Sequence, residues 1–365
     1  MLRILQIGLG PNPGGIESCI LNYHRNIDKT KFTFDYADIY GNGLAHSAEI
    51  EALGGKIYKL PNYKKHPIKM ARQLGRIIKE QNYDIVHINM LSAANMLPVR
   101  TAVKRGCGKV IVHCHNSAVP TGFLRTTLNN LNLNALRNLT VEKWACGVKA
   151  GQWMWGEAFD TENVIPNAID SNRFTPVASV RKNIREMCGF KDEDVIVGFV
   201  GRFSEQKNVL FLPEILSELK KHSAEYKMLL VGDGDLKTQL QEKFSAFGLD
   251  GQVYYAGVQS NAADWYQAMD AFVLPSLFEG LPVVGIEAQA NGLPCFLSNT
   301  ITGELNITGT IQYLPIDGSA KVWADKIIDV LGETIRGNVA FPNEYEITFA
   351  AKKLEEKYAS LLAGS

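Results

Sequence analysis

The chain alternates short apolar runs, rich in β-branched and aromatic residues, with longer stretches in which apolar residues recur at helical spacing. This alternation predicts an α/β protein with parallel sheets covered by helices. Strands of the first half are expected at Arg3–Ile7, Thr33–Asp38, Lys56–Leu60, Ile85–Ile88 and Val110–Cys114. Strands of the second half are expected at Val195–Val200, Lys227–Val231, Val253–Tyr255, Ala271–Leu274 and Cys295–Leu297.

A segment without periodicity, Val164–Pro176, is rich in Pro, Asn and Asp and predicts a linker between the two groups. The 365 residues suffice for two domains. The opening pattern of strand, glycine loop and helix returns loosely from Val195, so we expect two similar domains that face each other across a cleft. We place them at residues 1–166 and 167–344, with a helix at 345–365 that crosses back to the first domain.

The charge balance and the cysteine spacing argue against several classes of protein. Lys and Arg together number 38, as do Asp and Glu, so no global field attracts nucleic acid. The start of the chain resembles a first strand and not a signal peptide, and no apolar stretch is long enough to cross a bilayer. We expect a cytoplasmic protein that is soluble or lies on a membrane. Its cysteines lack CxxC or zinc spacing and are expected to be reduced and mostly buried: Cys19, Cys107, Cys114, Cys146, Cys188 and Cys295.

The opening loop, GLGPNPGGIE, follows the first expected strand. Gly8 and Gly10 fit a dinucleotide fingerprint, but Pro13 stands where that fingerprint needs its third glycine, which argues against NAD. Gly14 and Gly15 fall at the expected helix start, where free amides suit an anion or a closely packed sugar ring. A turn without a ligand is the alternative.

The loop after Val195–Val200 carries Arg202 and Lys207 and is expected to open a helix. Two cations beside a helix N-terminus form a site for a diphosphate, and a solvated loop with unrelated charges is the alternative. A DxD follows a later strand, at Asp233 and Asp235. It allows a metal site, but Asp235 is more simply a helix N-cap, and we expect no metal and no cofactor.

A second polar set follows Ala271–Leu274. Glu279 and Glu287 are separated by seven residues, and Glu287 lies in the apolar stretch VVGIEAQA. A carboxylate there is costly unless it is hydrogen-bonded, as the hydroxyls of a ribose would do. Pro282 is expected in the first helical turn, which leaves the amides of Gly280 and Leu281 for a ligand.

The chain resembles the family 4 retaining glycosyltransferases, which have the GT-B fold of two Rossmann-like domains. The resemblance rests on PSLFEGLP and AQANGLP around the two glutamates, and on GGIE, VIPNAID, GRFSEQKN and LLVGDGDL elsewhere. PNPGGIE and HCHN are most similar to the branch that builds bacterial capsules and exopolysaccharides.

The resemblance implies transfer of a sugar from a nucleotide sugar, expected to be a UDP-sugar, to a saccharide acceptor, for which a lipid-linked saccharide is one alternative. It also implies that the anomeric configuration is retained and that no metal takes part. Arg202 and Lys207 then hold the donor diphosphate, Glu287 the ribose, and Glu279 with the amides of Gly280 and Leu281 the transferred sugar. Gly15 lets the first domain approach the donor. Further donor-binding positions are Gly14, Gly232 and Val258. The acceptor is expected on the first domain.

A histidine that contacts the transferred sugar is also implied. His115 lies at the mouth of its expected strand, on the same face as His113, which is the competing candidate. His87 lies on another expected strand and is expected to be structural.

A basic segment, Lys64–Lys79, has six basic residues and no acidic one. If Pro67 opens a helix, its cations share one face, which is either an ordinary solvated face or a patch for anionic membrane at its inner surface. Phe123–Trp144 is expected to line an acceptor groove. Two other functions stay open: a sugar-nucleotide epimerase on the same fold, and a non-catalytic subunit that binds nucleotide sugars.

Overall fold

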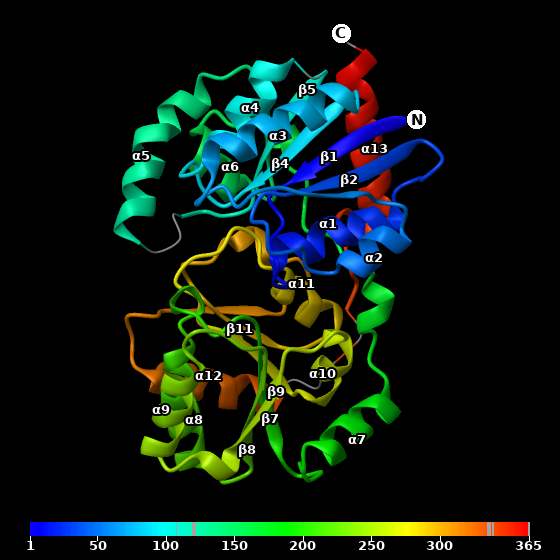
Figure 1. The fold of residues 1–365 in the computed structure, drawn as a ribbon. Helices are drawn as coiled ribbons and strands as arrows, with labels where there is room; N and C mark the ends of the chain where they lie inside the picture. The colour runs from blue at the N-terminus through cyan, green and yellow to red at the C-terminus, as the bar shows by residue number, and fades with distance from the viewer. Residues whose placement is uncertain (107, 119–121, 334–336, 338, 364–365) are drawn as a thin grey trace. The chain divides into compact units, whose positions relative to one another are not determined.

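The computed structural model describes residues 1–106, 108–118, 122–333, 337 and 339–363 (Figure 1). Cys107 and the last two residues of the expected C-terminal helix lie outside this range. The chain forms two compact units, Met1–Ile169 with Asn343–Ser365, and Asp170–Pro342. The division falls inside the expected linker, at Ile169 where the sequence placed it at residue 166.

The first unit contains a parallel sheet of six strands in the order β3-β2-β1-β4-β5-β6. Its strands are β1 (Leu2–Ile7), β2 (Phe32–Asp38), β3 (Ile57–Lys59), β4 (Ile85–Met90), β5 (Lys109–Cys114) and β6 (Glu142–Ala145). The sequence missed β6, because its first two residues are the charged Glu142 and Lys143, and only Trp144 and Ala145 are buried.

Helices cover both faces of this sheet (Figure 1). They are α1 (Gly15–Asn26), α2 (Ser47–Ala52), α3 (Pro67–Glu80), α4 (Leu97–Arg105), α5 (Phe123–Arg137), α6 (Val148–Trp155) and α13 (Ile347–Ala363). The expected crossing of the C-terminal helix is confirmed: α13, red in Figure 1, lies beside α1. Tyr358 of α13 is fully buried and stacks on Trp144 with 5.7 Å between ring centroids. The last helix therefore completes the core of the first unit.

The second unit repeats the same topology in a parallel sheet of order β12-β11-β10-β7-β8-β9. Its strands are β7 (Val195–Val200), β8 (Tyr226–Val231), β9 (Val253–Gly257), β10 (Ala271–Leu274), β11 (Cys295–Ser298) and β12 (Ile311–Leu314). The sequence missed β12, a short strand whose two middle residues are half-buried. The strand order reverses between β7 and β10, and ligands of such sheets bind beyond the carboxyl ends of the strands at this point.

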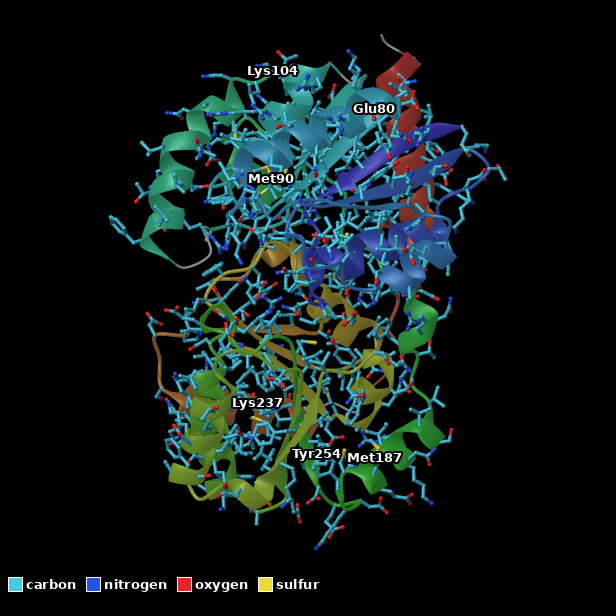
Figure 2. All side chains as sticks on the ribbon, in the orientation of Figure 1. Glu80, Met90, Lys104, Met187, Lys237 and Tyr254 are labelled. Atoms are coloured by element: carbon cyan, nitrogen blue, oxygen red, sulfur yellow. The ribbon has the colours of Figure 1, made fainter. Side chains whose placement is uncertain are left out.

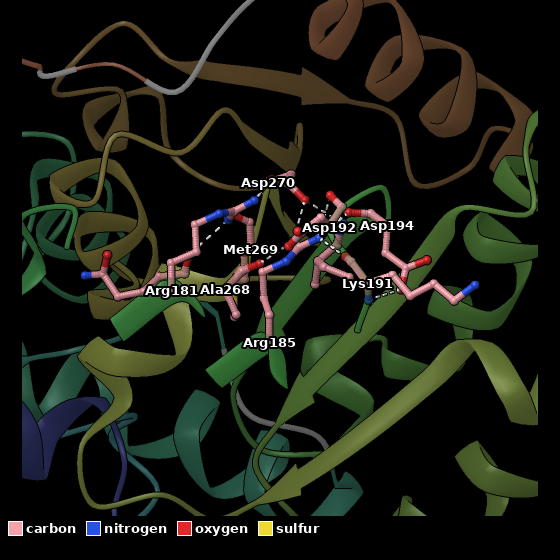
Figure 3. Close-up of polar contacts among 10 residues, drawn as sticks. Arg181, Arg185, Lys191, Asp192, Asp194, Ala268, Met269 and Asp270 are labelled. Carbon is pink, nitrogen blue, oxygen red and sulfur yellow. Dashed lines mark hydrogen bonds and ion pairs between the residues drawn. The ribbon is translucent and has the colours of Figure 1, made fainter. Parts of the chain in front are cut away.

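The helices of the second unit are α7 (Ala178–Met187), α8 (Leu212–His222), α9 (Lys237–Ala246), α10 (Ala262–Ala268), α11 (Val283–Ala290) and α12 (Ala320–Glu333). A charge network around the buried Arg185 joins α7 to the sheet (Figure 3). Arg185 donates to the carbonyl oxygens of Lys191 and Asp194 and pairs with Asp270, which also pairs with Arg181 at 2.6 Å. Asp270 accepts the amide of Ile196 as well. This network lies at the amino ends of the strands, so its role is structural.

Candidate functional site

Two candidate residues form an ion pair at the reversal point of the second sheet. Lys207 follows β7 and Glu279 follows β10, and the Nζ atom of Lys207 lies 2.7 Å from the Oε1 atom of Glu279. The two loops are also joined through Gln206, which accepts the amide of Leu277 at 2.8 Å and donates to the carbonyl of Phe278 at 3.0 Å. The sequence assigned these charges to different parts of a ligand and did not predict their contact.

Arg202 lies on the same loop but is exposed, and it has no hydrogen-bond or ion-pair partner within the described residues. The loop opens a helix, as expected, but the helix starts as two 3-10 turns, Glu205–Lys207 and Val209–Phe211. Asn208 between them takes a left-handed backbone with φ 51°, and α8 begins only at Leu212.

Gly232 allows the loop after β8 to approach the loop after β7. Its φ is 140°, and a Cβ atom there would lie 2.0 Å from the carbonyl oxygen of Gly201. Any side chain at this position would displace one of the two loops. Val258, directly after β9, is 63% exposed, so it is accessible from solvent.

The loop before α11 holds the next candidates. Glu279, Gly280 and Leu281 are all buried. Pro282 is the N-cap of α11 and not a residue of its first turn, since the helix begins at Val283. The fixed φ of proline, here −69°, is compatible with both positions, which is why the sequence did not separate them.

Glu287 lies within α11, as expected, and is half-buried. Its Oε2 atom accepts a hydrogen bond of 2.8 Å from the hydroxyl of Tyr266, a fully buried residue of α10. Burial raises the pKa of Glu287 above its ordinary value, and the bond from Tyr266 opposes that rise. Tyr266 is a partner that the sequence did not predict, because nothing in the spacing of α10 and α11 shows that they meet.

The DxD residues do not form the expected N-cap. Helix α9 begins at Lys237 with Leu236 as its N-cap, so Asp235 lies one position too early. Asp233 accepts the amide of Gly234 and pairs with Lys237 at 2.7 Å, and this contact with Lys237 lowers its pKa. Over the described ranges, no three His, Cys, Asp or Glu side chains gather in a way that could hold a metal ion.

The glycine loop belongs to the first unit. Gly8 has φ 115°, and a Cβ atom there would lie 2.1 Å from the carbonyl oxygen of Asn89 on β4. Helix α1 begins at Gly15 after the extended N-cap Gly14, and Glu17 in its first turn accepts the amide of Gly10 at 2.7 Å. The loop is therefore held at both ends, which explains Gly8 and Glu17 without a ligand.

Three histidines of the neighbouring strands β4 and β5 lie together, with His87 within β4. His115 directly follows β5, and its Nε2 atom lies 2.9 Å from Oδ1 of Asn89. The ring of His113 lies 4.0 Å from that of His115 and contacts His87 on its other side. Burial lowers the pKa of His115 to about 3, so its ring is neutral near pH 7. His113 is the more deeply buried of the two candidates.

The structure thus brings Arg202, Lys207, Glu279 and Glu287 into the second unit and His115, Gly14 and Gly15 into the first. Helix α3 begins at Pro67, as expected, and exposes the basic face of Lys64–Lys79. No described helix is long and apolar enough to pass through a membrane. Each described cysteine has a free thiol, and all are buried except Cys188, which is half-buried.

Comparison with known proteins identifies the family. Residues 194–333 match the family described as "Glycosyl transferases group 1". EpsF of Bacillus subtilis, a protein assigned as a glycosyltransferase, is 31% identical over 335 residues, which cover 89% of this chain and 86% of that protein. CapH of Staphylococcus aureus, a capsular polysaccharide biosynthesis glycosyltransferase, is 22% identical over 99% of both chains.

The fold has matches among solved structures. The crystal structure of HepE from Anabaena, in complex with UDP and glucose, matches with a TM-score of 0.73 and 17% identity over 100% of this chain and 98% of that one. The doubly wound sheets described above are those of the GT-B fold. None of these relatives supports the epimerase alternative. The chain belongs to the family 4 glycosyltransferases, in the branch of capsular polysaccharide and exopolysaccharide synthesis.

Proposed function

We propose that this chain is a retaining glycosyltransferase that moves a sugar from a UDP-sugar to a saccharide acceptor in surface-glycan synthesis. The observation that carries the proposal is the charged set at the reversal point of the second sheet. Arg202 is exposed and available there, and Lys207 lies against Glu279. A guanidinium and an ammonium on one loop suit a diphosphate, and a carboxylate beside them suits sugar hydroxyls.

In the proposed reaction, the bond between the anomeric carbon and the β-phosphate oxygen breaks, and a bond from the acceptor oxygen to the same carbon forms. The acceptor attacks from the face that the diphosphate leaves, and its hydroxyl proton passes to the departing phosphate oxygen. Arg202 and Lys207 stabilise the charge that grows on the diphosphate, a contribution of about 3 kcal/mol for each well-placed donor. His115 contacts the transferred sugar.

The donor is tested by thermal unfolding of the full chain with UDP-, GDP- and ADP-sugars. UDP-sugars should raise the melting temperature, and a rise with GDP- or ADP-sugars alone would contradict the choice of nucleotide. Release of UDP from the stabilising sugar then separates an enzyme from a non-catalytic binding subunit. Proton NMR of the product gives its anomeric configuration, and inversion would contradict retention.

The reaction is proposed to need no metal, because side-chain cations meet the charge of the diphosphate. Addition of EDTA should leave the rate of UDP release unchanged. A strict requirement for a divalent cation would instead point to Asp233 and Asp235, with Asp233 exchanging Lys237 for the ion.

The acceptor is proposed to be a saccharide that the first unit meets at a membrane surface. Helix α4, which packs against α3, adds the exposed Lys104 to the cations of α3 (Figure 2). Helix α5 exposes Phe123, Leu124 and Leu131. Exposed apolar residues with cations in the same unit suit an anionic lipid surface.

Vesicle sedimentation tests this contact. The protein should sediment with vesicles of phosphatidylglycerol and should stay in the supernatant with vesicles of phosphatidylcholine. Replacing Lys69 and Arg72 by Glu should weaken the effect, whereas the same replacement of the exposed Lys321 and the half-buried Lys326 of the second unit should not. Equal sedimentation of all three proteins would exclude the α3 face.

A further inference from the structure

Polar side chains from three neighbouring strands of the first unit form a buried hydrogen-bond network. Gln6 lies on β1, Asn89 on β4, and His115 directly after β5. All three are less than a tenth exposed. Buried polar groups are costly unless they are hydrogen-bonded, so the orientation of each group is set by its neighbours.

A backbone carbonyl fixes the orientation of the Asn89 amide. Its Nδ2 atom lies 3.3 Å from the carbonyl oxygen of Ile7 and 3.0 Å from Oε1 of Gln6. A carbonyl oxygen only accepts, so the amino group of Asn89 must face Ile7 and its Oδ1 atom must face His115. Because Oδ1 also only accepts, His115 carries its hydrogen on Nε2.

The neutral ring of His115 therefore has its free electron pair on Nδ1. That atom has no hydrogen-bond partner within the described residues, and the residue as a whole is 8% exposed. A neutral imidazole held in this tautomer accepts a hydrogen bond from a hydroxyl group at Nδ1.

From Gln6 the hydrogen-bonded network continues to the C-terminal helix α13. Gln6 donates to the hydroxyl of Tyr358, which lies 2.7 Å from Nδ1 of His87. The hydroxyl hydrogen goes to His87, which in turn donates from Nε2 to Nδ1 of His113 at 3.2 Å. Burial lowers the pKa of His87 to about 3 and the pKa of His113 well below its ordinary value, so these two imidazoles are neutral as well.

We propose that Asn89 is a positioning residue that holds His115 in its Nε2–H tautomer, so that Nδ1 accepts a hydroxyl of the transferred sugar. The proposal rests on the proposed function, in which His115 contacts that sugar. It assigns a role to a residue that no motif contains, and it makes the sugar hydroxyl the donor of the contact.

The first test reads the tautomer directly. Long-range proton–nitrogen NMR correlations of the full chain, labelled with nitrogen-15 histidine, distinguish Nε2–H from Nδ1–H, and His115→Ala identifies the signals of His115. The wild-type chain should show Nε2–H at pH 7.5. An Nδ1–H tautomer would overturn the assignment. In Asn89→Ala the His115 signals should shift to a mixture of tautomers.

The second test is a double-mutant cycle on the rate of UDP release from UDP-glucose, UDP-galactose and UDP-N-acetylglucosamine. Asn89→Ala and His115→Ala should each lower the rate about tenfold, and the double variant should be no slower than the slower single variant. The dissociation constant for UDP alone should stay unchanged, since UDP lacks the sugar. Losses that multiply to about a hundredfold would mean that Asn89 acts without His115.

Asn89→Asp is a conservative variant that keeps an oxygen beside Nε2 but adds a negative charge, which favours the imidazolium. Its rate should rise between pH 5.5 and 8 as the ring loses its proton, and the wild-type rate should show no such step. A wild-type pH profile in this variant would contradict the positioning role.

Asn291→Ala is the matched control, because Asn291 is a fully buried asparagine of the second unit with a hydrogen bond to the Phe174 carbonyl. This variant should have a lower thermal stability but an unchanged rate of UDP release. A wild-type rate in His115→Ala would overturn the sugar contact of the proposed function. A wild-type rate in Asn89→Ala beside a slow His115→Ala would overturn the positioning role alone.

Discussion

The Nζ atom of Lys207 lies 2.7 Å from the Oε1 atom of Glu279, and the two side chains are only 17% and 9% exposed. The cation proposed for the diphosphate and the carboxylate proposed for the sugar are thus in contact. A change in one residue must alter the environment of the other, so stability and activity have to be measured together for each variant.

Lys207→Met should lower both stability and turnover. The substitution removes the cation beside a buried carboxylate, which costs about 3 kcal/mol of the free energy of unfolding. Turnover should fall about a hundredfold. Adding Glu279→Leu should restore stability without restoring turnover, as judged by urea unfolding and UDP release. Lys243→Met is the control, because Lys243 forms its ion pair with Glu214 at a more exposed site. Recovery of turnover in the double variant would contradict the role of Lys207.

Arg202→Ala should separate activity from folding. The side chain is exposed and pairs with no described residue, so the free energy of unfolding should change by less than about 0.5 kcal/mol. Turnover should fall about a hundredfold, because one charged donor to the diphosphate is lost. UDP release and urea unfolding measure the two quantities. A wild-type rate would remove Arg202 from the site.

The affinity for UDP should weaken as the pH falls, in part through Glu287. A ribose hydroxyl donates to the carboxylate form, and burial raises the pKa of Glu287, so protonation begins at a higher pH than for an exposed glutamate. Calorimetry at pH 7.5 and pH 5 should show a smaller loss of affinity in Glu287→Gln, which also corrects for protonation of UDP itself. Tyr266→Phe should move the loss to higher pH, because the Tyr266 hydroxyl opposes the rise in pKa. Identical pH dependence in all three proteins would exclude Glu287 from the ribose site.

Much of the fold was predictable because buried parallel strands are continuous apolar runs. Val195–Val200 and Ala271–Leu274 have the predicted bounds, since each run follows an aspartate and ends before a glycine or a proline. The strand at Glu142–Ala145 was not predictable, because only half of it is buried and two of its four residues are charged. The hydrophobic pattern of a segment indicates how far its side chains are buried, and edge strands bury few side chains.

The candidate site was predictable only as far as it follows strand ends. The strand ends singled out Arg202, Lys207 and Glu279 as candidates, which stay predictions. Tyr266 and Asn89 could not be singled out in this way, because each contacts a candidate that is distant in sequence, Glu287 in one case and His115 in the other. Asp235 was misplaced because an aspartate before a helix fits several loop positions, and the choice depends on a tertiary contact of the loop.

Gly232→Ala should destabilise the second unit far more than Gly251→Ala. A Cβ atom at Gly232 would lie 2.0 Å from a backbone oxygen, whereas nothing lies within 4 Å of the corresponding position at Gly251. Backbone must move to relieve the contact, and the left-handed φ adds strain, so we expect a loss of more than about 2 kcal/mol in the free energy of unfolding. Equal melting temperatures in the two variants would contradict the close approach of the loops.

Stability of the first unit should fall in mild acid. Burial lowers the pKa of His24 to about 4, and its Nδ1 atom lies 2.9 Å from the Tyr36 hydroxyl. In the unfolded chain His24 has its ordinary pKa of about 6.5, whereas in the folded chain the pKa is about 4. Between these pH values the unfolded state binds the proton and the folded state does not, so stability is full above pH 6.5 and declines as the pH falls toward 4. Between pH 7.5 and pH 5 this one residue should cost about 2 kcal/mol in urea unfolding. His24→Asn should remove that share of the pH dependence, and the exposed His222→Asn should not.

The placement of α13 has a consequence for biosynthesis. Residues 170–342 leave the ribosome as an uninterrupted stretch and can fold as soon as they emerge, whereas the earlier 169 residues must wait for a helix translated after them. Until then the surface that Tyr358 and Leu354 cover stays open to water and to other nascent chains. A premature stop codon shortly before Ile347 would leave the second unit, Asp170–Pro342, intact but would remove α13 from the core of the first unit.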